Sequence, residues 1–81
     1  MIRVLFFGML ATKTGVRETH LELKRPGATL SDVMEELGKR FALPPKAPYM
    51  LAVNEAQADP STVLKDGDEV AVMPPFSGGL G

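Results

Sequence analysis

The first part of the chain carries apolar residues in a pattern typical of β-strands. Residues 2–9 are apolar at almost every position, as in a strand that is covered on both faces. Residues 17–23 instead alternate between apolar or threonine positions and Glu or His positions. The Thr-Lys-Thr-Gly segment at 12–15 lies between them and predicts a glycine-containing turn. We therefore expect the two segments to form a β-hairpin.

The middle of the chain carries apolar residues at helical spacing. Pro26-Gly27 interrupts the strand pattern, and Thr29 followed by Asp32 is a helix-capping signal. The apolar positions of one helix face come next: Leu30, Val33, Met34, Leu37 and Phe41. We expect one amphipathic helix that ends near Phe41.

The second half of the chain predicts three short strands separated by turns. The strand segments are residues 50–53, 56–58 and 69–73, and the turn signals are Asn54-Glu55 and Asp66-Gly67-Asp68. Pro74-Pro75 ends the last strand, because proline cannot donate to a strand ladder.

These elements predict an α+β fold with the order β-β-α-β-β-β. The first and last strands are the most apolar, so we expect them side by side in the centre of a mixed sheet with one main helix packed on one face, the β-grasp arrangement. We expect residues 1–73 to form this domain and residues 74–81, rich in Gly and Pro, to form a flexible tail.

One helix covers only one face of the sheet, so the other face predicts a partner protein. If Val4 and Phe6 point to the helix, Leu5 and Phe7 point away from it. On the last strand, Val70 and Val72 should point inward while Ala71 and Met73 point outward. Phe7 and Met73 are therefore the expected anchors of a docking surface. A twisted or bulged first strand would instead bury both Phe6 and Phe7.

Composition narrows the function classes. The chain has 81 residues, no cysteine and a formal net charge of −1, which excludes disulfides and thiolate metal sites and disfavours nucleic acid as a partner. No apolar run is long enough for a membrane span, and the start lacks a signal-peptide pattern, so we expect a cytoplasmic protein. One His, one Tyr and no Trp leave few groups for autonomous catalysis.

Several polar residues are of types that bind metals or transfer protons, but the neighbouring sequence does not favour such a role. Asp66, Asp68 and Glu69 lack the ligand spacing of a calcium loop and are expected in a solvated turn, with a weaker alternative that they meet basic residues of a partner. His20 is expected to be exposed beside Glu18 and Glu22, with no ligand or acid–base role. Ordinary packing is expected for three methionines, at 34, 50 and 73, and solubilising surface charge for Arg3, Lys39, Arg40, Lys46 and Lys65.

Four motifs occur in an order and spacing that resemble a known family: Val4-Leu5-Phe6-Phe7-Gly8, Ala52-Val53-Asn54-Glu55, Leu64-Lys65-Asp66-Gly67-Asp68-Glu69-Val70 and Pro74-Pro75-Phe76-Ser77-Gly78-Gly79. The chain is similar over essentially its full length to the MoaD family, the small subunits of molybdopterin synthase, which are ubiquitin-like β-grasp sulfur carriers. The resemblance implies that a separate, MoeB-like enzyme adenylates the C-terminal glycine with ATP and that a sulfur donor protein converts it to a thiocarboxylate.

The resemblance also implies that a large, MoaE-like subunit holds the cyclic pyranopterin precursor and supplies the catalytic side chains. Phe7, Met73 and the segment Pro74, Pro75, Phe76 and Ser77 are then expected to contact this partner, and Gly78 and Gly79 to enter its pocket. Glycine suits a narrow channel because it has no Cβ. No bound cofactor or metal is expected in this chain.

The chain departs from the family pattern because it continues with Leu80-Gly81 after Gly79. A protease could remove these two residues and expose Gly79, the partner's pocket could be deeper so that Gly81 itself is activated, or the protein could serve another route. Other functions also stay open: a ubiquitin-like modifier joined to lysines, a sulfur carrier for thiamine, a tungsten cofactor or an amino acid, or a binding domain without terminal chemistry.

Overall fold

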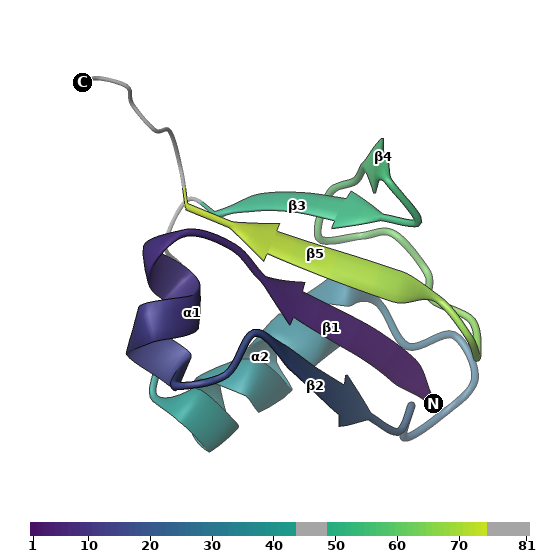
Figure 1. The fold of residues 1–81 in the computed structure, drawn as a ribbon. Helices are drawn as coiled ribbons and strands as arrows, with labels where there is room; N and C mark the ends of the chain where they lie inside the picture. Colours follow the sequence, from purple (N-terminus) through teal and green to yellow (C-terminus); the bar gives the residue numbers. More distant parts are fainter. Residues whose placement is uncertain (44–48, 75–81) are drawn as a thin grey trace.

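A mixed five-stranded sheet forms the centre of the protein, in a computed structural model that describes residues 1–43 and 49–74. The strand order is β2-β1-β5-β3-β4 (Figure 1). The strands are β1 (Ile2–Phe6), β2 (Glu18–Leu21), β3 (Met50–Val53), β4 (Ala56–Gln57) and β5 (Glu69–Met73). The central pair, β1 and β5, is parallel, and the other neighbouring pairs are antiparallel. This confirms the predicted β-grasp arrangement, with the first and last strands in the centre.

One face of the sheet packs on the main helix, α2 (Leu30–Phe41), which lies behind the strands in Figure 1. The residues buried between them share inward-facing positions: Ile2, Val4, Phe6, Val70 and Val72 from the strands, and Leu30, Val33, Met34 and Leu37 from α2. The Phe6 ring contacts the Phe41 ring edge to face, with centroids 5.4 Å apart. The predicted inward positions are therefore confirmed.

The predicted capping signal forms the start of α2. The Thr29 hydroxyl accepts from the Asp32 backbone N–H at 3.4 Å, and the Asp32 carboxylate accepts from the Thr29 backbone N–H at 2.9 Å. Arg25 also pairs with this carboxylate at 2.8 Å. The backbone hydrogen bond from Thr29, followed by the charge of Arg25, lowers the pKa of Asp32.

The structure contradicts the predicted course of residues 2–15. The first strand ends at Phe6, and a short helix, α1 (Met9–Thr14), replaces the expected turn. This helix ends at Gly15, which has φ 82° and donates its N–H to the Ala11 carbonyl at 2.9 Å. A glycine in the left-handed conformation occurs both at the C-terminus of a helix and in the turn of a hairpin, so its presence does not distinguish the two. The prediction of a turn at this position was therefore wrong, whereas the predicted antiparallel pairing of the two strands is confirmed.

Of the two turns predicted between residues 50 and 73, one is confirmed and the expected exposure of the other is wrong. Asn54 and Glu55 form the predicted tight turn, with φ of 51° and 72°. Asp68, expected in a solvated turn, is instead buried. Its carboxylate accepts from the Lys65 backbone N–H at 2.8 Å and from the Asn54 amide at 2.9 Å, and these bonds lower its pKa.

Within residues 1–43 and 49–74, no helix is both long and apolar enough to span a bilayer.

Candidate functional site

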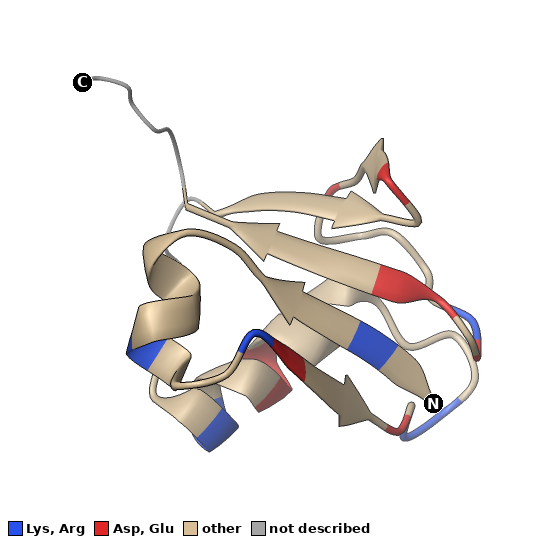
Figure 2. Ribbon diagram, in the orientation of Figure 1, with Lys and Arg blue, Asp and Glu red and all other residues tan. Residues whose placement is uncertain are grey.

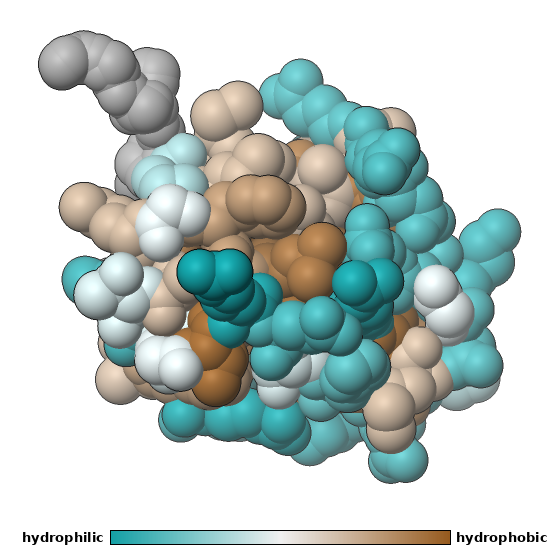
Figure 3. Space-filling model, in the orientation of Figure 1, coloured by the Kyte–Doolittle hydropathy of each residue, from teal (hydrophilic) through white to brown (hydrophobic). Residues whose placement is uncertain are grey.

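The face of the sheet opposite α2 carries a continuous group of apolar side chains. Outward-facing residues of three neighbouring strands meet there: Leu5 and Phe7 from β1 and its end, Ala71 and Met73 from β5, and Met50 and Ala52 from β3. We call these six residues the apolar patch. Figure 3 shows this face, with brown and tan surface across the strands. Because α2 covers the other face, the patch is open to a partner.

The register of the strands places the patch residues in two rows. Leu5 lies opposite Ala71, which in turn lies opposite Ala52 on β3. In the next row, Met73 lies opposite Met50. Phe7 and Met50 are 46% and 47% exposed, the kind of aromatic and thioether groups that supply contact area at interfaces. The outward orientation of Phe7 is confirmed, whereas ordinary packing was the wrong prediction for Met50.

A charged network borders the apolar patch at the end of the sheet far from the tail. Arg3 on β1 contacts Glu18 of β2 at 3.0 Å and Glu69 of β5 at 3.1 Å. His20 lies 3.5 Å from the same Glu18 carboxylate. Figure 2 shows a blue segment on β1 and a red segment on β5 toward the N-terminal end of β1, whereas Glu18, at the start of β2, lies opposite Leu5. Arg3 therefore bridges three strands, a role beyond the predicted solubilising charge, and His20 is exposed as expected.

The base of the tail is held beside the apolar patch by a close backbone contact. The Phe7 N–H donates to the Val72 carbonyl at 3.1 Å, which continues the pairing of β1 with β5. Gly8 has φ 61°, and a Cβ added to it would lie 3.2 Å from Cγ of Pro74. Pro74 is half-buried there. The chain thus leaves the sheet next to Phe7 and Met73, although sequence analysis did not reveal this role of Gly8.

The described part of the predicted site comprises Phe7, Met73 and Pro74, which the fold brings together. Pro75, Phe76, Ser77, Gly78, Gly79 and Gly81 lie outside the described residues. The predicted roles of these residues, and the division into a domain of residues 1–73 and a tail of residues 74–81, stay predictions.

Few titratable side chains of the described residues lie around the apolar patch. Among residues 1–43 and 49–74, no three His, Asp or Glu side chains are grouped so that they could hold a metal ion. Arg3 contacts the carboxylates of Glu18 and Glu69, and Arg17 lies beside Leu5 and Phe7. The geometry of this face is suited to docking a protein.

Comparison with known proteins relates this arrangement to one family. The model of the ThiS family matches residues 4–79. The chain is 36% identical over 81 residues to the molybdopterin synthase sulfur carrier subunit of Arabidopsis thaliana, in an alignment that covers 96% of this chain and 82% of that protein.

Solved structures show the same fold. Small archaeal modifier protein 1 of Haloferax volcanii has a TM-score of 0.83 at 22% identity, covering 93% of this chain and 97% of that chain, which is a likeness of fold alone. A chain in the complex of subunits 1 and 2 of molybdopterin-converting factor from Helicobacter pylori has a TM-score of 0.68 at 25% identity, covering 96% of this chain and 97% of that chain.

Proposed function

The chain belongs to the ThiS family, and from this premise we propose that it is the sulfur carrier subunit of a molybdopterin synthase. The observation that carries the proposal is the position of the apolar patch. Phe7 and Met73 lie where β5 passes through Pro74 into the glycine-rich C-terminal segment. A partner that covers this patch would receive the C-terminal segment at the edge of the same interface.

We propose that the chemistry takes place at a C-terminal glycine carboxylate. A carboxylate oxygen attacks the α-phosphorus of ATP, so that pyrophosphate leaves and an acyl adenylate forms. A hydrosulfide ion released by a donor protein then attacks the acyl carbon, the bond from that carbon to the AMP oxygen breaks so that AMP leaves, and a thiocarboxylate remains. No side chain of this carrier takes part in these bond changes. The protein alone is therefore proposed to be no catalyst, and the reaction is expected in the cytoplasm, where ATP is supplied.

The partners of the proposal follow from these steps. An adenylating enzyme and a sulfur donor act first, and a large subunit then binds the apolar patch and takes the thiocarboxylate into a pocket that holds the pterin precursor. The likeness to a chain of the Helicobacter pylori complex supports the large subunit as a partner. The open patch, bordered by the Arg3 network, supports one docking surface used in turn by different enzymes.

Gly79 is proposed as the reactive position, after removal of Leu80-Gly81. The match to the family ends at Gly79, which supports this assignment. Two extended residues would carry the carboxylate about 7 Å farther, and Leu80 would add a branched side chain to the channel. Activation of Gly81 in a deeper pocket is the alternative that the test must separate.

The test is intact mass spectrometry after incubation with ATP, an adenylating enzyme and a sulfur source. Three chains are compared: the full sequence, one that ends at Gly79, and one that ends at Ser77 as the matched control. We expect only the chain that ends at Gly79 to gain the mass difference between sulfur and oxygen. A gain by the full chain instead would assign Gly81, and no gain by either glycine-ended chain would contradict sulfur carriage.

A further inference from the structure

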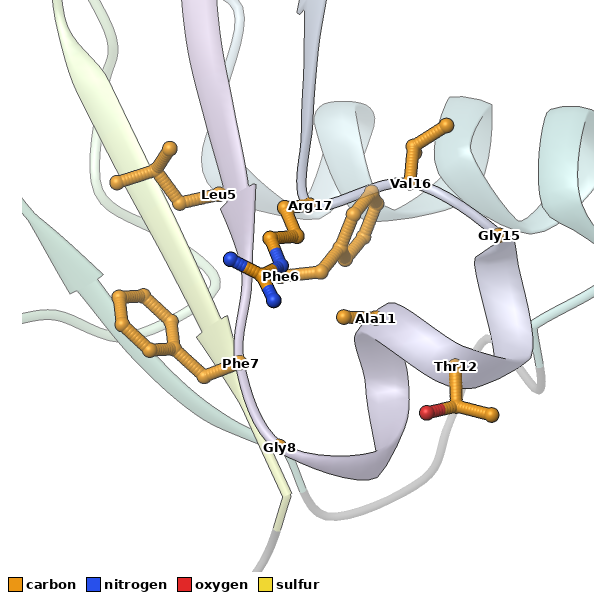
Figure 4. Close-up of a pocket in the computed structure, with 9 residues that line it drawn as sticks. All are labelled: Leu5, Phe6, Phe7, Gly8, Ala11, Thr12, Gly15, Val16 and Arg17. Atoms are coloured by element: carbon orange, nitrogen blue, oxygen red, sulfur yellow. The ribbon is translucent and has the colours of Figure 1, made fainter.

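A groove lies between the end of β1 and the short helix α1, on the side of the apolar patch. Its walls include Leu5 from β1 and Phe7 directly after it, Ala11 and Thr12 from α1, and Val16 and Arg17 from the connection to β2. In Figure 4, Leu5 and Phe7 extend to one side of β1 and Phe6 to the other. The groove shares Leu5 and Phe7 with the apolar patch, so a partner on the patch also reaches the groove.

Among the residues that the structure describes, Arg17 is the only charged one that lines this groove. Its side chain extends from the start of β2 toward β1 in Figure 4, with the guanidinium group at the level between Leu5 and Phe7. No acidic side chain lines the groove, and the carboxylate of the adjacent Glu18 contacts Arg3.

The other three arginines show by contrast that Arg17 is unusual. Arg3, Arg25 and Arg40 each contact a carboxylate, at distances of 3.0, 2.8 and 3.8 Å. The Arg17 guanidinium has no hydrogen bond or ion pair to any residue in the described ranges 1–43 and 49–74. An exposed guanidinium between apolar walls is well suited to a carboxylate, because its planar fork can donate two parallel hydrogen bonds that gain strength when water is excluded.

We propose that this groove receives an apolar side chain of the large subunit together with a neighbouring Asp or Glu whose carboxylate pairs with Arg17. The inference rests on the proposed function, because it takes the large subunit as the occupant. Two observations favour that occupant: the groove is continuous with the apolar patch, and Gly8, which also lines it, lies so near Pro74 that a Cβ added to it would be 3.2 Å from Cγ of Pro74. A single unpaired charge in an apolar setting selects partners, since a surface without the matching carboxylate would leave Arg17 desolvated and unpaired.

The test measures binding of thiocarboxylated carrier to the large subunit by calorimetry, for wild type, Arg17→Ala, Arg17→Glu and Arg17→Lys. Lys39→Glu is the matched control, because it makes the same change of charge at an exposed position on α2. We expect Arg17→Ala to raise Kd about 10-fold or more and Arg17→Glu to raise it further, while Lys39→Glu stays within about 2-fold. The Kd of Arg17→Lys should lie between those of wild type and Arg17→Ala, because lysine keeps the positive charge but lacks the planar guanidinium group that donates two parallel hydrogen bonds.

Each outcome decides between the inference and the function on which it rests. Wild-type binding with unchanged Kd for all Arg17 variants would overturn the inference and leave the proposed function standing. Weaker binding of Arg17 variants to the adenylating enzyme alone would overturn the choice of occupant. Wild-type carrier that does not bind the large subunit would overturn both. If Arg17→Glu fails to fold, judged by circular dichroism, Arg17→Ala and Arg17→Lys still give the answer.

Discussion

Two adjacent phenylalanines have opposite roles in this protein. Phe6 is 4% exposed and packs against Phe41, whereas Phe7 is 46% exposed in the apolar patch. The alternation of side chains along a strand accounts for the difference, and it also made the difference predictable from the sequence. The bulge that would have buried both rings does not occur, because β1 keeps its pairing with β5 through the Phe7 N–H.

We predict that Phe7→Ala weakens binding to the large subunit about 10-fold or more while the free energy of unfolding changes little, because the ring is lost from an interface and not from the core. Binding by calorimetry and urea unfolding would measure the two effects. Phe6→Ala is the matched control and should cost about 3–5 kcal/mol of stability. A Phe7→Ala protein that unfolds, or that binds as tightly as wild type, would remove Phe7 from the docking surface.

Asp68 carries a pH-dependent part of the stability. Its pKa lies below the ordinary value of 3.8, chiefly because the Lys65 N–H donates to the ionised carboxylate. The stabilisation is therefore fully present above about pH 4 and is lost as the pH falls through the lowered pKa. We predict that Asp68→Asn lowers the free energy of unfolding by about 1–3 kcal/mol at pH 7 and by less at acidic pH.

Urea unfolding of wild type and Asp68→Asn at pH 7 and at several pH values below about 4 would measure this difference. Glu55→Gln, at an exposed turn position, is the control and should change stability little. A difference between wild type and Asp68→Asn that stays constant over the whole range would contradict the assignment.

Among the elements, α1 shows most clearly where prediction from sequence failed. Its N-cap is Gly8, with no side-chain hydrogen bond to the helix, and its first turn has no acidic residue. A helix of six residues also has too few turns for a clear apolar period. Gly15 was recognised as a turn residue, but the same left-handed glycine ends a helix. The groove that contains Arg17 depends on α1, so it was not predictable either.

The main helix, by contrast, was predictable because both capping groups and the apolar stripe lie close together in the sequence. We predict that Thr29→Ala lowers the free energy of unfolding by about 1 kcal/mol, because the Asp32 N–H loses its side-chain acceptor. Ser31→Ala, an exposed position in the first turn, is the control and should change stability by only about a few tenths of that amount. Equal urea midpoints for Thr29→Ala and wild type would contradict the energetic role of the cap.

At the scale of the whole molecule, the sheet has one covered face and one open face. The strong apolar character of β1 and β5 predicted that these strands lie side by side in the centre, where the structure shows a parallel pair. The single long helix predicted that one face would stay open. The proximity of Gly8 to Pro74 was not predictable, since these residues lie near opposite ends of the chain. The roles of Gly78, Gly79 and Gly81 stay predictions, because these residues lie outside the described ranges.

The most direct test of the proposed function is reconstitution of molybdopterin synthesis. The carrier that ends at Gly79, with its thiocarboxylate, is mixed with a large subunit and the cyclic pyranopterin precursor, and both molybdopterin and the remaining thiocarboxylate are measured. We predict that molybdopterin forms as the thiocarboxylate is consumed, and that the same carrier with an ordinary carboxylate gives none. A thiocarboxylate that persists without product in the presence of a bound large subunit would contradict the proposal.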